Sequence, residues 1–285
     1  MKVIKCKNVT KKYKNKVVLD NIDLDIEEGK IYGLIGRNGA GKTTLLSLIA
    51  AHNPVTDGSI MLDDEIIWEN PNALEQICFS WQIPSASPSN TKEFLTLGEL
   101  YYPNWDTEYA NRLVELFEID IKKSISKLSK GMQSMVTIII ALASKAKFTF
   151  IDEPTAGLDV ISRDLFYKLL IEEYTETNRT FVISTHIIDE AADVFEEVII
   201  LKDNKVLIKE NTQDLLNRAF YVSGKEEVID KVTANMKCYH KESIGRSKKL
   251  TVLLEEGENI EETDEITIRP VTLQSLFVAL CGKEV

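Results

Sequence analysis

The sequence predicts an α/β fold with a mostly parallel sheet, and three patterns lead to this prediction. Apolar runs of strand length at residues 148–151, 180–183 and 198–201 alternate with helical patterns, as in a parallel sheet that is buried on both faces. Residues 1–35 hold earlier strand-like runs, whereas residues 94–117 repeat apolar side chains at helical spacing. We therefore expect an N-terminal antiparallel β subdomain, a parallel-sheet core and a helical insert.

Strand signals fill the first part of the chain. The strand-like runs there are residues 3–9, 17–19, 24–26, 31–35 and 59–62. A turn at residues 28–30 precedes the fourth run, and a cluster of turn-forming residues at 53–58 precedes the fifth. Between these turns, residues 44–49 follow a helical pattern, so the first helix of the core is expected directly after the strand at 31–35.

The phosphate-binding loop, Gly-Arg-Asn-Gly-Ala-Gly-Lys-Thr at residues 36–43, stands between that strand and that helix. Glycines let the backbone curl so that N–H groups point at phosphate oxygens, and the next helix directs its positive dipole end at the same anion. Lys42 adds a positive charge, and Thr43 offers a hydroxyl to Mg²⁺. The loop predicts a P-loop NTPase core. The expected nucleotide contacts are Asn38, Gly39, Ala40, Gly41, Lys42, Thr43 and Thr44.

A strand that ends in two acidic residues supplies a second element of phosphate chemistry. Residues 148–151 are followed by Asp152 and Glu153. Because ligands of an open parallel sheet bind at the carboxyl ends of its strands, Asp152 is expected to face the nucleotide and to hold Mg²⁺. Glu153 is then placed to orient the attacking water or to accept its proton. Together with the phosphate-binding loop, this strand predicts hydrolysis of the nucleotide.

The length of the chain, 285 residues, allows two domains. Residues 1–217 hold the core elements, with a helical insert at about 85–145. Residues 218–285 contain a strand-like run at 249–254 and a final helix over 273–280, so they predict a small α+β accessory domain.

Composition limits the partners. The formal net charge is −11, from 45 acidic residues against 34 lysines and arginines, and a surface that binds phosphate backbones must be basic. We therefore expect no nucleic-acid partner. The N-terminus soon turns polar, and no apolar run approaches the roughly 18 to 20 residues that span a bilayer. We expect a soluble chain whose role at a membrane would depend on a partner.

Further segments resemble motifs of the ATP-binding cassette (ABC) ATPases. Residues 128–133, Leu-Ser-Lys-Gly-Met-Gln, resemble the Leu-Ser-Gly-Gly-Gln signature, and residues 154–159 are similar to the D-loop that follows the Walker B strand. Ser-Thr-His at residues 184–186 resembles the switch-histidine motif. Gln82 stands in the place of the Q-loop glutamine, and Tyr13 stands where these ATPases carry an aromatic that stacks on adenine. The order of the motifs is that of one complete cassette.

The resemblance implies ATP and Mg²⁺ as cofactors and gives roles to single residues. Ser129 and Gly131 are implied to contact the γ-phosphate of ATP bound to the opposite subunit, and Asp159 is implied to act across the same interface. His186 is implied to contact the γ-phosphate and to hold Glu153 and the attacking water in place. Ser129 is also a good helix N-cap in its own right, so a helix is expected to start after it.

Gln82 is implied to take part in hydrolysis by sensing both Mg²⁺ and the partner protein. Tyr13 has two open interpretations, a platform for adenine or an ordinary strand aromatic. The signature departs from its consensus at Lys130 and Met132, which bears on the rate of turnover rather than on ATP binding. Lys130 could add positive charge near the phosphates or point to solvent, and we favour solvent.

For the segment after the signature, the intrinsic propensity of the residues and the resemblance to the family predict different secondary structures. Val-Thr-Ile-Ile-Ile at residues 136–140 is β-branched and favours a strand. The resemblance implies a buried helix there, and the Ala-Leu-Ala run at 141–143 supports it. We expect a helix.

A single cassette holds half of each catalytic site, so the resemblance implies a dimer with a second ABC ATPase subunit, identical or related. The leading expectation is the ATP-hydrolysing subunit of a bacterial ABC-2-type exporter of peptides, drugs or lipids. Such a subunit would lie at the cytoplasmic face of the cell membrane, docked on a transmembrane permease. Residues 101–106, Tyr-Tyr-Pro-Asn-Trp-Asp, offer large side chains either for that docking or for core packing.

The alternative is a soluble ABC ATPase that acts on ribosomes or DNA. Such proteins usually carry two cassettes or a long coiled coil between the phosphate-binding loop and the signature. This chain has one cassette, no heptad run in that interval and an acidic composition, so the alternative is disfavoured. A non-hydrolysing regulatory cassette is disfavoured as well, because Glu153 and His186 are both present.

Overall fold

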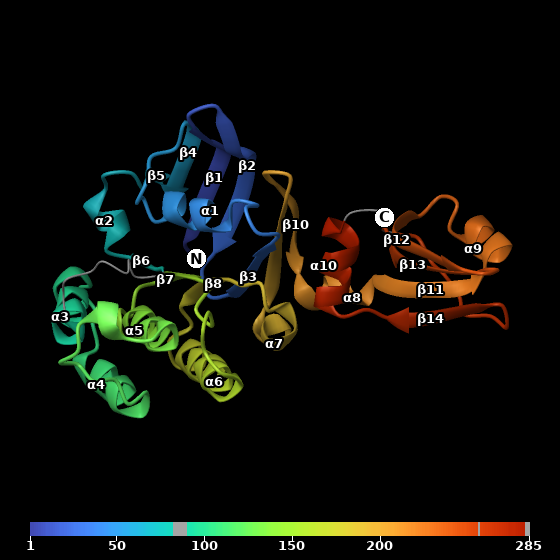
Figure 1. The fold of residues 1–285 in the computed structure, drawn as a ribbon. Helices are drawn as coiled ribbons and strands as arrows, with labels where there is room; N and C mark the ends of the chain where they lie inside the picture. The colour runs from blue at the N-terminus through green and yellow to red at the C-terminus, as the bar shows by residue number, and fades with distance from the viewer. Residues whose placement is uncertain (82–89, 256, 283–285) are drawn as a thin grey trace.

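The computed structural model describes residues 1–81, 90–255 and 257–282, and the strands in these ranges form three sheets (Figure 1). The first sheet is antiparallel. Its order is β2 (Lys16–Glu27), β1 (Val3–Tyr13), β4 (Asp57–Leu62) and β5 (Glu65–Ile66). Buried and exposed side chains alternate along β2, because one face of this sheet covers the core. The expected N-terminal antiparallel subdomain is confirmed.

The second sheet lies at the centre of the molecule. Its order is β10 (Lys205–Asn211), β9 (Glu197–Lys202), β3 (Ile31–Gly36), β8 (Thr180–Ser184), β7 (Phe148–Asp152) and β6 (Ile77–Ser80). Every neighbouring pair is parallel except β10 with β9. Strands β3, β7 and β8 are buried along their whole length, as their unbroken apolar runs require. The predicted mostly parallel sheet is therefore confirmed.

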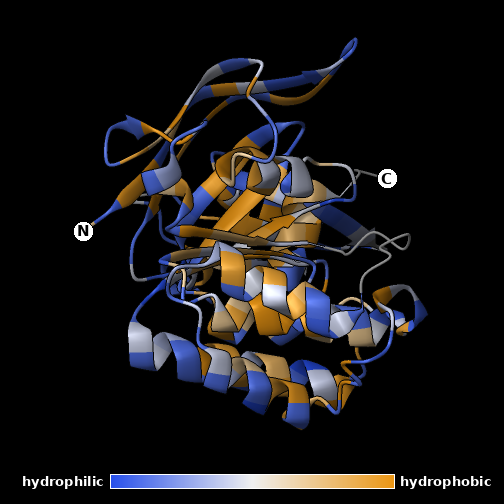
Figure 2. Ribbon diagram, turned by 90° about the vertical axis from the view of Figure 1, so that its left-hand side faces the viewer, coloured by the Kyte–Doolittle hydropathy of each residue, from blue (hydrophilic) through white to orange (hydrophobic). Residues whose placement is uncertain are grey.

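Helices and the first sheet cover the two faces of the central sheet. Helix α1 (Lys42–Ile49) packs with the first sheet into one apolar cluster, and α5 (Lys130–Ala143) packs with α6 (Val160–Thr177) into another. Figure 2 shows the apolar strands between these two layers. Short helices α2 (Pro71–Leu74) and α7 (Ile188–Ala191) connect elements of the core.

The helical insert consists of α3 (Thr91–Tyr101), α4 (Thr107–Leu116) and the long helix α5. Asn90 starts α3 with a capping box to Glu93, and Asp106 caps α4. The β-branched run at residues 136–140 lies inside α5, as expected, with Val136, Ile138 and Ile139 fully buried. Burial of this face overrides the strand propensity of the run.

The C-terminal part begins after α8 (Thr212–Asn217) and contains the third sheet (Figure 1). The antiparallel order is β12 (Lys237–Ile244), β13 (Ser247–Leu253), β11 (Ala219–Lys225) and β14 (Ile266–Pro270), and α9 (Glu226–Val232) packs on it. The last helix, α10 (Leu273–Cys281), packs into the cluster that holds α5 and α6. Within the described ranges, none of the helices has the length and apolar character that crossing a bilayer requires.

Candidate functional site

The phosphate-binding loop joins the end of β3 to the start of α1. Gly39 and Gly41 have positive φ angles of 82° and 104°, which favour glycine. A Cβ on Gly41 would lie 2.7 Å from Leu19 Cδ2 and 3.0 Å from the carbonyl oxygen of Val18, so this position has no room for a side chain. Among the residues that the structure describes, no side chain caps α1, and the first N–H groups of a helix have no partner within it. The geometry is that of an anion cradle.

The buried ammonium of Lys42 lies inside this cradle. Its Nζ donates a 2.8 Å hydrogen bond to the carbonyl oxygen of Gly36 and lies 3.8 Å from Glu153 Oε1. The lysine is therefore held between the loop and the end of β7. Asn38 and Gly39 are exposed at the tip of the loop, whereas Thr44 is half-buried at the start of α1.

A hydroxyl group and a carboxylate meet beside the loop. The hydroxyl of Thr43 donates a 2.7 Å hydrogen bond to Asp152 Oδ2, so the carboxylate at the end of β7 faces the first turn of α1. A hydroxyl and a carboxylate fit Mg²⁺, which is held in proteins by one or two carboxylates together with substrate phosphates. Among the described residues, no three His, Cys, Asp or Glu side chains group as a metal site.

Glu153 has a strained backbone with a φ of 51°, a value that is uncommon outside glycine. Its N–H donates to the carbonyl oxygen of Ser184 at 3.2 Å and to the hydroxyl of Ser184 at 3.0 Å, and these contacts maintain the conformation. The carboxylate bonds to Nδ1 of His186, which follows β8 and is 55% exposed. The structure thus brings Lys42, Asp152, Glu153 and His186 to one edge of the sheet.

Ser184 is a residue of this group to which sequence reasoning assigned no role of its own. Its hydroxyl donates a 2.5 Å hydrogen bond to Asp152 Oδ1 and accepts the N–H of Glu153. The side chain is fully buried at the end of β8, where it links the two acidic residues. The available signal was its place two residues before His186, at the carboxyl end of a strand that neighbours β7.

The signature segment, residues 128–133, starts helix α5. Ser129 is the N-cap, as predicted, and accepts the N–H of Met132 at 3.2 Å. A Cβ on Gly131 would lie 2.6 Å from the carbonyl oxygen of Gly157, so Gly131 is needed for packing against the D-loop segment, residues 154–159. Sequence reasoning assigned this glycine only to approach of a phosphate. Lys130 is exposed to solvent, as favoured above.

Asp159 ends the D-loop segment and caps α6. Its carboxylate accepts the N–H of Ser162 at 2.8 Å, and this bond holds the pKa of Asp159 below its usual value. The next two residues, Val160 and Ile161, are 66% and 81% exposed at the start of α6. The D-loop segment therefore leads into two exposed apolar side chains.

Ser129, Gly131 and Asp159 form a second group. Within the ranges that the structure describes, no hydrogen bond or ion pair joins them to the phosphate-binding loop. Tyr13 ends β1 with 45% of its surface exposed, and Lys11 Nζ lies 5.0 Å from its ring centroid. Gln82 lies outside the described residues.

Comparison with known proteins agrees with this arrangement. The model of the "ABC transporter" family matches residues 19–156. The chain is 32% identical to "Phosphonates import ATP-binding protein PhnC 1" of Halalkalibacterium halodurans, over 76% of this chain and 93% of that protein. It is 27% identical to "Bacitracin transport ATP-binding protein BcrA" of Bacillus licheniformis, over 98% and 97% of the two chains.

A solved structure shows the same fold. The ATP-binding cassette MJ0796, described as a dimeric post-hydrolysis state bound to ADP and phosphate, matches 73% of this chain and 98% of its own, with 27% identity and a TM-score of 0.65. The phosphate-binding loop, the acidic strand end and the signature helix are thus found on a shared architecture. The chain belongs to the ATP-binding subunits of the ABC transporter family.

Proposed function

We propose that this chain dimerises on ATP, hydrolyses it with Mg²⁺ and thereby powers export through a membrane permease. The observation that carries the proposal is the separation of the two residue groups. Lys42, Thr43 and Asp152 lie at one edge of the sheet, whereas Ser129 lies at the start of α5, and within the described ranges no hydrogen bond or ion pair joins it to them. A second subunit would bring its own signature helix to this chain's phosphate-binding loop.

Each residue then has a defined task. Lys42 and the loop N–H groups bind the β- and γ-phosphates, and Thr43 and Asp152 would hold Mg²⁺, which offsets the charge of the phosphate oxygens. Glu153 orients the attacking water, with His186 fixing its carboxylate. The partner's signature helix directs its N-terminal N–H groups at the γ-phosphate. Gln82 and Tyr13 are proposed to contact Mg²⁺ and adenine, respectively.

The first test is trapping of the dimer. Glu153→Gln should abolish phosphate release and give a stable dimer in ATP and Mg²⁺, measured by light scattering after gel filtration. Lys42→Ala is the control, since it should stay monomeric under the same conditions. A Glu153→Gln protein that hydrolyses ATP at the parent rate would remove Glu153 from its role, and one that never dimerises would contradict the shared site.

A groove between the core and the helical insert is the proposed docking site of the permease. It has a volume of about 640 Å³, and its lining is mostly apolar. Trp81, Leu97 and Tyr101 line it with exposed fractions of 42%, 42% and 72%. Such an apolar patch on a surface is typical of a protein contact. We propose that a helix on the cytoplasmic side of the permease fills this groove, which would place the chain at that face of the membrane.

Capture from detergent-extracted membranes tests the docking. The parent chain should recover a protein with several membrane spans, and Leu97→Asp in the groove should lose it. Leu116→Asp is the matched control, because Leu116 is 46% exposed on α4 outside the groove. Recovery of ribosomes, DNA or only soluble proteins would instead favour the alternative of a soluble ABC ATPase.

Export is proposed from the resemblance of the signature segment and the C-terminal part to ABC-2-type exporter ATPases. The likeness to the bacitracin transport protein extends over 98% of this chain, whereas the phosphonate import protein matches 76% of it. We further propose residues 1–217 as the ATPase domain and residues 218–285 as an accessory domain. The end of α10 lines a cavity of about 440 Å³ together with residues 37–40 of the phosphate-binding loop, which supports the proposal that this domain influences nucleotide binding or the dimer. Transport into or out of vesicles with the recovered permease would determine the direction.

A further inference from the structure

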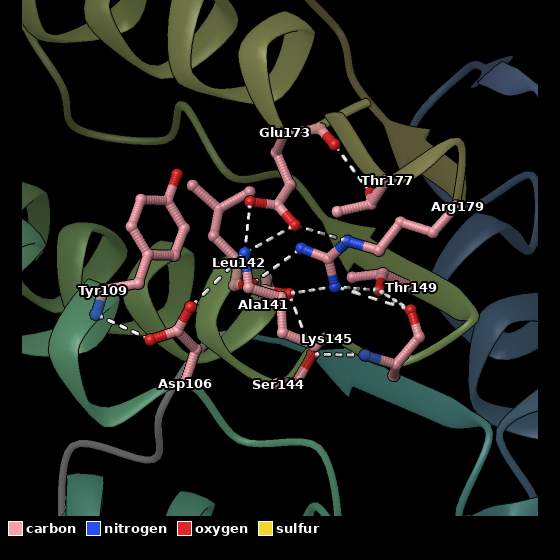
Figure 3. Close-up of polar contacts among 11 residues, drawn as sticks. Asp106, Tyr109, Ala141, Leu142, Ser144, Lys145, Thr149, Glu173, Thr177 and Arg179 are labelled. Carbon is pink, nitrogen blue, oxygen red and sulfur yellow. Dashed lines mark hydrogen bonds and ion pairs between the residues drawn. The ribbon is translucent and has the colours of Figure 1, made fainter. Parts of the chain in front are cut away.

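A buried ion cluster lies at the carboxyl end of the signature helix α5. Glu173 on α6 has a side chain that is 1% exposed and faces two cations. Lys145 Nζ donates to both carboxylate oxygens, at 2.8 and 2.7 Å. Arg179 Nε lies 3.2 Å from Oε1, close enough for an ion pair, although its N–H is not aligned for a hydrogen bond. Figure 3 shows the three side chains converging between α5, α6 and β8.

Arg179 also holds the last turn of α5. Its Nη2 donates a 2.7 Å hydrogen bond to the carbonyl oxygen of Leu142, and Nη1 donates to the carbonyl oxygens of Ala141 and Ala146 at 3.3 and 3.4 Å. Carbonyl groups at the end of a helix lack partners inside it and carry the negative end of its dipole, so a buried guanidinium suits them. Glu173 orients that guanidinium.

Lys145 connects the same cluster to the helical insert. Its ammonium lies 3.8 Å from Asp106 Oδ2 and 4.3 Å from the ring centroid of Tyr109, both at the start of α4 (Figure 3). The N–H of Asp106 donates to the carbonyl oxygen of Ala143 in α5 at 2.9 Å. The cluster therefore fixes the end of α5 relative to α4, α6 and β8 together.

The opposite end of α5 carries the signature. The helix has 14 residues, so its two ends are about 21 Å apart at a rise of about 1.5 Å per residue. A tilt of about 5° at the cluster would move Ser129 by about 2 Å, whereas a misplacement of about 1 Å can cost catalysis a hundredfold. The orientation of α5 at Glu173 therefore contributes to where Ser129 and Gly131 lie, together with the packing of Gly131 against the D-loop segment.

Buried ion clusters can often be replaced by apolar side chains without loss of stability, so these charges are better explained by orientation than by stability. We infer that Glu173 is a positioning residue that fixes the carboxyl end of α5 through Lys145 and Arg179, so that Ser129 and Gly131 meet ATP on a second copy of this chain. This inference rests on the shared site proposed above. Glu173 would then affect the ATP bound to the phosphate-binding loop of the partner subunit, and not the ATP bound to the loop of its own chain.

Mixed dimers test which nucleotide Glu173 serves. Full-length Glu153→Gln chains with two different affinity tags are mixed in equal amounts with ATP and Mg²⁺. The ATP trapped in complexes that carry both tags is counted relative to the total chain added. In one arrangement Lys42→Ala and Glu173→Gln are on the same chain, and in the other they are on separate chains.

Both arrangements are repeated with two other substitutions in place of Glu173→Gln. Ser129→Arg serves as the reference, because Ser129 lies in the signature itself. Asp164→Asn serves as the control, since Asp164 forms an exposed ion pair with Lys168 on α6.

When the two substitutions are on separate chains, Lys42→Ala and Glu173→Gln impair the same nucleotide site. The other nucleotide site should then still trap ATP. On one chain the two substitutions would impair different sites, and trapping should drop at least about fivefold, the lower end of a typical coupling free energy between two sites. The opposite pattern, or equal trapping in the two arrangements, would overturn the positioning role if Ser129→Arg shows the expected difference. If Ser129→Arg shows no difference, the shared site fails and the inference fails with it.

A folding defect is distinguished by a second variant and a second readout. Lys145→Gln removes one cation of the cluster from a side chain that is 21% exposed, so it disturbs the core less than a change at Glu173. It should reproduce the arrangement dependence of Glu173→Gln. The affinity of each single variant for ATP in the presence of EDTA, before dimerisation, should match the parent. A tenfold weaker affinity there would show that the cluster acts on its own chain's phosphate-binding loop.

Discussion

The hydroxyl of Ser184 donates a 2.5 Å hydrogen bond to the carboxylate of Asp152 across the neighbouring strands β8 and β7. The same hydroxyl accepts the N–H of Glu153 at 3.0 Å. One buried serine thus orients the carboxylate proposed to hold Mg²⁺ and the backbone of the residue proposed to orient water. Its two bonds supply a second partner for each acidic residue, beside Thr43 for Asp152 and His186 for Glu153.

Replacement of Ser184 by alanine should lower kcat for ATP hydrolysis about 10- to 100-fold, because both acidic residues lose a partner that fixes their geometry. The affinity for ATP should change little, since the phosphate-binding loop is untouched. Steady-state phosphate release and equilibrium ATP binding separate the two effects. Ser80→Ala is the matched control, because Ser80 is a buried serine at the end of β6 that bonds to Thr137 and not to the acidic residues. Equal kcat losses in both variants would contradict the specific role of Ser184.

Gly131→Ala should weaken ATP-dependent dimerisation without weakening ATP binding by the monomer. The new Cβ would lie 2.6 Å from the carbonyl oxygen of Gly157, so the signature segment and the D-loop segment must move apart. Both segments belong to the group proposed to face the second subunit. Sedimentation of Glu153→Gln chains with and without Gly131→Ala gives the dimer constant. Lys127→Ala, an exposed change just before the signature, should leave that constant unchanged.

Much of the site could be predicted from the sequence because its parts are local. The glycines, Lys42 and Thr43 stand on consecutive positions between a strand and a helix, and Asp152 and Glu153 end an apolar strand. The carboxyl ends of neighbouring parallel strands must meet, so their convergence followed from topology. Ser184 connects those strands through individual side-chain hydrogen bonds, and such bonds cannot be predicted from the periodicity of apolar residues.

The ion cluster shows a different limit of sequence reasoning. Glu172, Glu173 and Glu176 stand close together in α6, and no sequence pattern distinguishes one of them from the others. The burial of Glu173 against Arg179 and Lys145 is visible only in the structure, because Lys145 follows α5 and Arg179 directly precedes β8. The packing role of Gly131 was hidden for the same reason, since its contact, Gly157, lies on another loop.

His52 should titrate below the usual pKa of histidine, 6.5, because partial desolvation beside the groove disfavours its charged form. Its ring packs edge-on against Phe79 and Trp81, with centroids 5.1 and 4.6 Å apart. Because the unfolded chain binds this proton more strongly than the folded one, the free energy of unfolding is highest above pH 6.5. It decreases as the pH falls from 6.5 through the lower pKa of the folded state. NMR titration of the ring protons measures it. Trp81→Ala should raise the pKa toward 6.5, whereas Trp68→Ala should not.

The terminal helix α10 should unfold together with the ATPase core, not with the third sheet alone. Leu276 is fully buried in the cluster that also holds α5 and α6. Leu276→Ala should lower the free energy of unfolding by about 2–5 kcal/mol, the range for a buried leucine. Val278→Ala on the same helix should cost far less, because Val278 is 47% exposed. Urea denaturation followed both by ATP binding and by circular dichroism should then shift in one transition. Two transitions, with ATP binding unshifted by Leu276→Ala, would show instead that α10 is stabilised only by the accessory domain.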